Sequence, residues 1–178
     1  MYKYITKAYA TENGLLMAEF GGQLRSKEAA HRKPKAGADD SPKLHIHGAA
    51  GEYMACLAKG VSWQGPGTFR GEDIKGHDVR TVFKPNGPLR LRKGDNPDLK
   101  YILVAPTSNR LIWNVYDWIY GWQGMQDIFW VKKPTNGRLS LWEVDQGALP
   151  ILIKQRRLME NEKEEEWQDQ NQGEKEVQ

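Results

Sequence analysis

The chain has 178 residues, of which 39% are hydrophobic, enough for one domain with a buried core and too few for two comfortable ones. No run of about 18 apolar residues could span a membrane, and the first ten residues lack the apolar segment of a secretory signal. We therefore expect a cytoplasmic protein without membrane contact. Cys56 is the only cysteine, which excludes an intramolecular disulfide and a zinc site built from cysteines.

Charge is unevenly distributed along the chain. Residues 160–178 contain eight acidic residues and two lysines, a net charge of −6, which leaves +9 for the remainder. A basic body suits a polyanionic partner such as DNA. Because of their charge and polarity, we expect residues 154–178 to form a disordered or weakly helical tail.

The first third of the chain predicts two helices separated by a loop. Residues 1–30 indicate a short strand or coil, then a helix with apolar residues at helical spacing. Prolines, a glycine and alternating charges predict a mobile loop over residues 31–43. A second helix is expected over residues 49–60, with Glu52 in its first turns and Gly60 near its end.

The middle of the chain is rich in β-like runs. Four of them, residues 67–74, 77–83, 99–107 and 110–119, have the composition of strands. Between the second and third, residues 84–98 combine turn residues with basic ones, and residues 139–152 predict a last strand with a packed turn. We expect one α/β domain over residues 1–153.

A predicted hairpin around Lys75-Gly76 places two carboxylates together. If Ile74 and His77 flank the two-residue turn, Asp73 lies directly opposite Asp78, where like charges destabilise a strand pair. A cation between the carboxylates would stabilise them, and Mg²⁺ prefers oxygen ligands of this kind. The alternative is that both acids are merely solvated turn residues.

The order of acidic residues resembles a known superfamily. Glu52 on a helix, Asp73 on a hairpin and "DVR" at residues 78–80 are similar in arrangement to the motif of the PD-(D/E)XK nucleases. More closely, "HGAAGEYMACLAKGVSW", "GEDIKGHDVRT" and "LRLRKGDNPDLKYILV" resemble uncharacterised bacteriophage proteins of that superfamily, over roughly residues 44–150. The resemblance implies a restriction-endonuclease-like fold, a mixed central sheet of four or five strands flanked by helices.

The resemblance also implies metal-dependent hydrolysis of DNA phosphodiester bonds. Asp73 and Asp78 would bind Mg²⁺, or Mn²⁺ in its place, helped by Glu52 and the main-chain carbonyl of Val79. Arg80 stands where the superfamily has lysine; a guanidinium stays protonated, so it supplies charge and hydrogen bonds but no general base. The basic residues expected to attract the DNA backbone are Lys75, Arg90, Arg92 and Lys93.

Three alternatives stay open. A protein that keeps the nuclease fold without catalysing hydrolysis could bind nucleic acid or a host factor. Arg80, in the position of the superfamily's lysine, supports this hypothesis. His45 and His47 would share one face of an extended segment, close to Glu52, and could form a separate metal site. The nuclease fold is also compatible with a homodimer, although no interface can be identified from the sequence.

Overall fold

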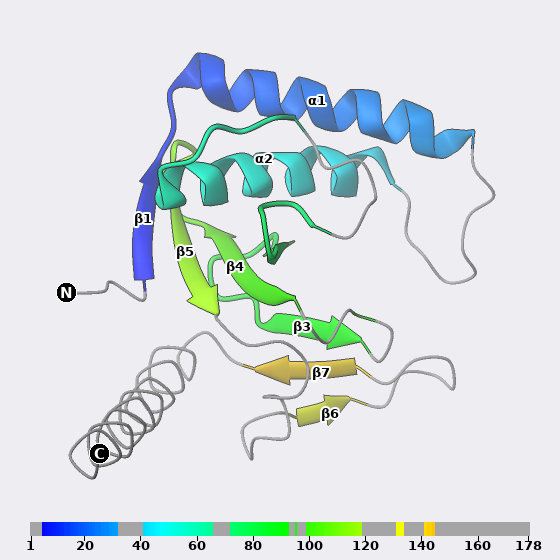
Figure 1. Cartoon of the computed structure of the whole chain (residues 1–178), viewed down its shortest axis with the longest axis vertical. Coiled ribbons are helices and arrows are strands. Elements are labelled where there is room, and N and C mark those ends of the chain that lie inside the picture. Colours follow the sequence, from blue (N-terminus) through cyan, green and yellow to red (C-terminus); the bar gives the residue numbers. More distant parts are fainter. Residues whose placement is uncertain are drawn as a thin grey trace, which may run out of the picture.

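The computed structural model describes residues 5–31, 41–65, 72–92, 95, 99–118, 131–133 and 141–144. Within these residues the chain forms nine elements, most of which are labelled in Figure 1. In chain order they are β1 (Ile5–Tyr9), α1 (Glu12–Ala30), α2 (Pro42–Lys59), β2 (His77–Thr81), β3 (Leu89–Arg92), β4 (Lys100–Pro106), β5 (Ile112–Trp118), β6 (Val131–Lys133) and β7 (Leu141–Val144). The acidic tail and most of the run at residues 67–74 lie outside the described residues.

The described strands form two sheets. The larger has the order β1-β5-β4-β2, with β2 parallel to β4 and the other neighbours antiparallel. This mixed four-stranded sheet with its helices confirms the predicted α/β fold class.

The smaller sheet, of order β3-β7-β6, was not predicted, and the interpretation of residues 89–92 as part of a turn region is wrong. Leu89 and Leu91 alternate with Arg90 and Arg92, the period of a strand, and β7 supplies the antiparallel partner.

Helix α2 begins earlier than the sequence indicated. Ser41 occupies the N-cap with extended backbone, and Pro42 follows at the first helical turn, where its fixed φ suits a helix. His45 and His47 therefore lie within α2, and residues two apart on a helix do not face each other. The expectation of two imidazoles on one face of an extended segment is wrong.

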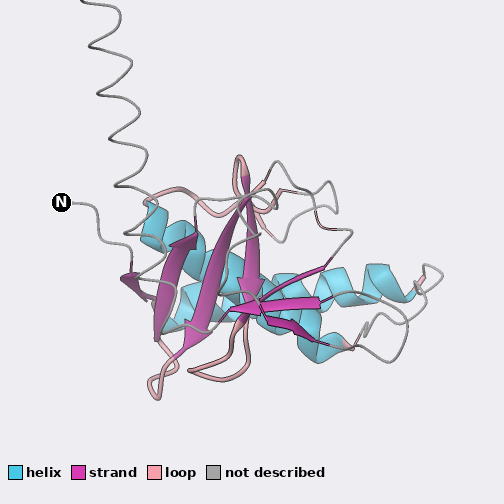
Figure 2. Ribbon diagram, turned by 90° about the horizontal axis from the view of Figure 1, so that it is seen from below, coloured by secondary structure: helices cyan, strands magenta, loops and turns pink. Residues whose placement is uncertain are grey.

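The two helices stack in layers on the sheet. Helix α2 lies between α1 and the sheet (Figure 1), and both helices lie behind the large sheet in the view of Figure 2. A Cβ on Gly22 of α1 would lie 2.5 Å from the Cα of Ile46 in α2. The absence of a side chain at Gly22 thus allows the helices to cross closely.

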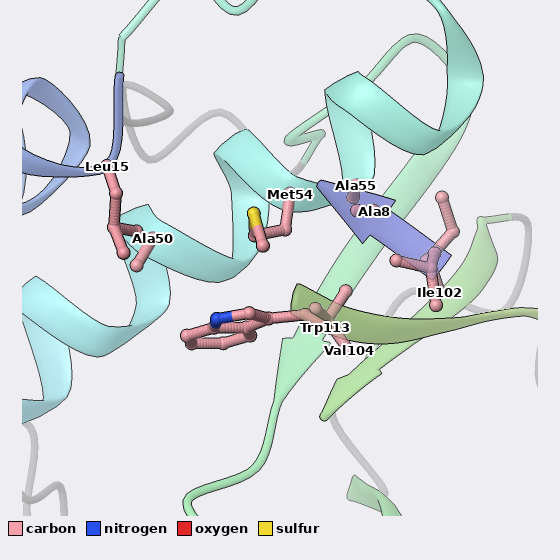
Figure 3. Close-up of a cluster of buried hydrophobic side chains, with 9 residues drawn as sticks. Ala8, Leu15, Ala50, Met54, Ala55, Ile102, Val104 and Trp113 are labelled. Carbon is pink, nitrogen blue, oxygen red and sulfur yellow. The ribbon is translucent and has the colours of Figure 1, made fainter. Parts of the chain in front are cut away.

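The core lies between α2 and the sheet. Figure 3 shows Ala50 and Met54 of α2 facing Trp113 of β5 and Val104 of β4, all buried. The N-terminal end of α1 reaches this cluster through Leu15. None of the helices in the described part of the chain is long and apolar enough to cross a membrane.

Candidate carboxylate and arginine site

The predicted two-residue turn is present. Ile74 and His77 form an antiparallel bridge around Lys75-Gly76, and the His77 N–H donates to the Ile74 carbonyl at 2.7 Å. Gly76 has φ +75°, a left-handed conformation that glycine adopts without a Cβ penalty. The turn therefore brings the segment of Asp73 alongside the start of β2, as the sequence indicated.

Asp73 is anchored to the backbone of β2. Its Oδ2 accepts a hydrogen bond from the Val79 N–H at 2.7 Å. Burial raises the pKa of Asp73, while this hydrogen bond and the charges of Arg25 and Arg80 act in the opposite direction. Because burial prevails, the Asp73 carboxylate occupies a place where further positive charge would stabilise its ionised form.

Asp78 and Arg80 form a paired group with Asp95. Arg80 Nε lies 2.7 Å from Asp78 Oδ1, and its Nη2 donates to Asp78 Oδ2 at 3.0 Å. The same Nη2 lies 3.1 Å from Asp95 Oδ1, and the guanidinium lies 5.5 Å from the centre of the Tyr101 ring. One arginine fork thus serves two carboxylates, which a lysine ammonium could not do with the same planar geometry.

The pKa of Asp78 is raised to about 6, chiefly by burial. The Arg80 charge lowers it, whereas the charges of Asp73 and Asp95 raise it. The influence of Asp73 shows that the two hairpin carboxylates interact electrostatically, as expected from their positions.

Glu52 belongs to a different ion pair. Arg25 of α1 lies 2.5 Å from the Glu52 carboxylate, with side chains only 12% and 6% exposed, and also donates to the His45 carbonyl at 3.1 Å. Burial, followed by the charges of Glu52 and Asp73, raises the pKa of Cys56 to about 11. Asp73 therefore shares an electrostatic environment with Glu52 as well as with Asp78.

Strand β2 separates Glu52 from Asp78. Val79 packs against the core cluster, and Thr81 lies against Gly51 of α2, where a Cβ would collide with the threonine side chain. Since side chains alternate along a strand, Asp78 and Arg80 project from the face of β2 away from α2. The structure thus brings Asp73 near the Arg25–Glu52 pair and near the Asp78–Arg80 pair. It does not place Glu52 beside Asp78.

Three of the basic residues assigned to the DNA backbone lie within the described residues. Lys75 is exposed in the hairpin turn, and Arg90 is exposed on β3 opposite Glu143. Arg92 is on β3 opposite Leu141. Lys93 lies outside the described residues, so its assignment stays a prediction.

The donor set is of the type that a hard divalent cation takes, namely carboxylate oxygens. Within the described ranges, however, no three histidine, cysteine, aspartate or glutamate side chains are grouped to hold a metal ion. Instead, Arg25 and Arg80 supply the positive charges next to Glu52 and Asp78. The chemistry of the carboxylates fits Mg²⁺, while the guanidinium of Arg80 is the cation held between Asp78 and Asp95.

Two residues of this site were missed by sequence reasoning. Arg25 lies on a helix that the sequence identifies only by its apolar spacing. Glu52 needs a cationic partner because it is buried, and the sequence does not show this burial. Asp95 lies within "KGDNPD", a segment with ordinary turn composition. No local signal links Asp95 to Arg80, although an arginine in a lysine position gives reason to look for a second acceptor.

Comparison of the chain with protein-family models, curated proteins and solved structures finds no match.

Proposed function

We propose that the chain is a metal-dependent nuclease that hydrolyses DNA phosphodiester bonds, with Asp73 and Asp78 as the carboxylates that would hold Mg²⁺ or Mn²⁺. The observation that carries the proposal is the Lys75-Gly76 turn, which brings two partly buried carboxylates together. Asp73 accepts the N–H of Val79, the neighbour of Asp78, and its charge raises the pKa of Asp78. A bound divalent cation polarises a phosphate oxygen and lowers the pKa of water.

Each residue then has a defined role. Asp73 is held by the Val79 N–H, which fixes one of its oxygens. Glu52 is paired with Arg25, whose charge also acts on Asp73, so Glu52 would be linked to the site through that arginine. Arg80 would bind the scissile phosphate, since a guanidinium recognises phosphate and carboxylate with the same fork. The backbone of the DNA would follow the basic residues Lys75, Arg90, Arg92 and Lys93.

A second candidate is favoured by the position of Arg80. Its guanidinium already bridges Asp78 and Asp95, so these carboxylates have a permanent counter-ion. A protein of this kind would bind nucleic acid, or a host factor, without turnover. The two candidates differ in whether the carboxylates take up a divalent cation and whether DNA is cut.

The test is cleavage of plasmid, linear duplex, single-stranded and branched DNA with Mg²⁺ or Mn²⁺, beside a binding assay in Ca²⁺. We expect Asp73→Asn to abolish cleavage and Glu72→Gln to leave it unchanged. Glu72 is an exposed acid whose carboxylate accepts the Gly76 N–H at 3.1 Å, so it is a matched control. Arg80→Ala should lower turnover by about 2 to 4 kcal/mol of transition-state stabilisation.

Arg80→Lys distinguishes the two candidates. A nuclease should retain or increase cleavage in this variant, because lysine is the usual residue of the motif that the sequence resembles. If the unaltered chain binds DNA without cutting it and Arg80→Lys gains cleavage, the binding function is the correct one. Failure of the unaltered chain to bind any of the four DNAs would remove nucleic acid as a partner.

A further inference from the structure

Helix α1 buries mostly small residues and exposes large apolar ones. Its buried positions are Leu15, Ala18, Gly22 and Ser26, which face α2. The outward face instead carries large apolar side chains, each about half exposed or more. They are Leu16 at 51%, Met17 at 64%, Phe20 at 54% and Leu24 at 44%.

We name these four residues the outer stripe. Leu16, Phe20 and Leu24 follow one another at intervals of four, so they lie one above another on the helix surface, and Met17 lies beside them. Isolated exposed apolar residues are normal, whereas a contiguous exposed group marks an interaction surface. Helix α1 forms the outermost layer of the described structure, on the side of α2 away from the sheet (Figure 1).

The outer stripe is self-complementary when two copies of α1 run antiparallel. Leu16 and Leu24 lie equally far before and after Phe20, so a two-fold axis at Phe20 brings Leu24 of one copy beside Leu16 and Met17 of the other. A two-fold interface uses the same surface on both subunits. Antiparallel pairing also opposes the two helix dipoles favourably.

The charges at the ends of the stripe fit the same arrangement. Glu12 lies eight residues before Phe20 and Lys27 seven residues after it, both exposed. In the antiparallel pair Glu12 of each copy approaches Lys27 of the other, which gives two opposite-charge contacts. Glu12 remains 60% exposed although Arg110 of its own chain lies 3.1 Å away.

We infer that the outer stripe is the interface of a homodimer in which the two α1 helices pack antiparallel about Phe20. The inference does not rest on the proposed nuclease activity, because the stripe lies on α1, away from the carboxylates of the hairpin. Its hydrophobic residues would be the energetic centre and the Glu12–Lys27 pairs the polar rim.

Sedimentation of the full chain at increasing concentration tests the interface. We expect a monomer–dimer equilibrium that favours the dimer at about 50 μM, and Phe20→Ser should raise the dissociation constant at least about tenfold. Leu57→Ser is the matched control, since Leu57 is an exposed apolar residue at 37% on α2, and it should leave the equilibrium unchanged. Circular dichroism at low concentration checks that both variants fold.

Charge reversal tests the antiparallel arrangement. Glu12→Lys and Lys27→Glu should each weaken the dimer by setting like charges against each other, and an equimolar mixture of the two variants should restore it as a heterodimer. A parallel pair would gain nothing from the unaltered charges, so neither single variant would weaken it. A chain that stays monomeric at about 200 μM, or a dimer indifferent to Phe20→Ser, would overturn the inference. The first of these results would leave the stripe to a partner of different sequence.

Discussion

Helices α1 and α2 have almost the same length, 19 and 18 residues, but the molecule uses them differently. Helix α2 is packed on two sides, by the sheet and by α1, and its buried residues lie at 49–52 and 54–56. Among the described elements, helix α1 packs mainly on α2, through a row of mostly small residues. Helix α2, which lies between the two layers, is also the more hydrophobic of the two helices.

This difference explains the composition of each helix. A helix packed on two sides needs small residues for close approach, which α2 has in Ala49, Ala50 and Gly51. It can bury a charge only where a neighbour neutralises it, and Arg25 of α1 does this for Glu52. The inner face of α1 is therefore energetically important, whereas its outer face contributes little to the stability of the monomer.

The largest expected effect comes from breaking the ion pair between the helices. Arg25→Met should lower the free energy of unfolding by about 3 to 5 kcal/mol, because Glu52 would be buried without its counter-ion. Urea unfolding at pH 7 measures the change. The double variant Arg25→Met/Glu52→Gln should recover much of the loss.

Arg110→Met is the control on the outer side. Arg110 pairs with Glu12 and Glu19 of α1 but is half exposed, and exposed ion pairs contribute about 0 to 1 kcal/mol. Equal losses from Arg25→Met and Arg110→Met would show that the two helices do not differ in the way described.

Methionine truncation compares the two helices directly. Met54 of α2 is fully buried, and Met17 of α1 is 64% exposed. We expect Met54→Ala to cost about 2 to 5 kcal/mol and Met17→Ala to change stability by about 0.5 kcal/mol or less. Thermal unfolding of dilute protein gives both values. A costly Met17→Ala under dilute conditions would mean that the outer stripe packs within the monomer.

Gly22 tests the closeness of the helix crossing. A methyl group there would meet the backbone of α2, at the Cα of Ile46 and the carbonyl of His45, so Gly22→Ala should destabilise by about 1 to 3 kcal/mol. Gln23→Ala, at the next and exposed position, should change stability by about 0.5 kcal/mol or less. If Gly22→Ala instead stabilised the protein, as helix propensity alone would predict, the two helices would have to lie further apart than the structure shows.

The smallest expected effect concerns pH and His47. Burial is the main cause that lowers the pKa of His47; the charge of Lys43 acts in the same direction, whereas the hydrogen bond to the Val82 carbonyl and the charge of Glu19 oppose it. The unfolded chain then binds a proton more readily than the folded one. Stability from this residue is present above the unfolded pKa of about 6.5 and is lost as the pH falls below it.

His47→Gln keeps a hydrogen-bond donor for Val82 but does not titrate. Between pH 7.5 and 5.5, the loss of stability should therefore be smaller in this variant, by about 1 kcal/mol or less. Identical slopes for this variant and the unaltered chain would remove His47 as a contributor.

Strands β4 and β5 were predictable because their apolar runs are long and bounded by turn residues. The start of α2 was not, because two histidines and a proline weaken a helical pattern although the proline itself begins the helix. The small sheet depends on pairing between β3 and β7, about 50 residues apart. Local sequence does not encode that pairing.

The candidate site was predictable in part for a similar reason. A two-residue turn fixes the register of its hairpin, so the neighbourhood of Asp73 and Asp78 follows from local sequence. The separation of Glu52 from Asp78 depends on which face of β2 packs on α2, a tertiary choice. The roles of Arg25 and Asp95 depend on contacts across 27 and 15 residues, which periodicity cannot detect.

The pairing of β1 with β5 also affects how the chain is made. Ile5 lies opposite Tyr116 and Tyr9 opposite Ile112, so β1 leaves the ribosome more than 100 residues before its partner. The two helices are close in sequence and can associate while translation continues, whereas β1 cannot pair until β5 has been synthesised. Closing so long a loop costs entropy before any strand pairing is gained, which slows folding. The last step in assembling the large sheet is therefore set by the arrival of β5, and until then β1 is an unpaired edge exposed to other nascent chains.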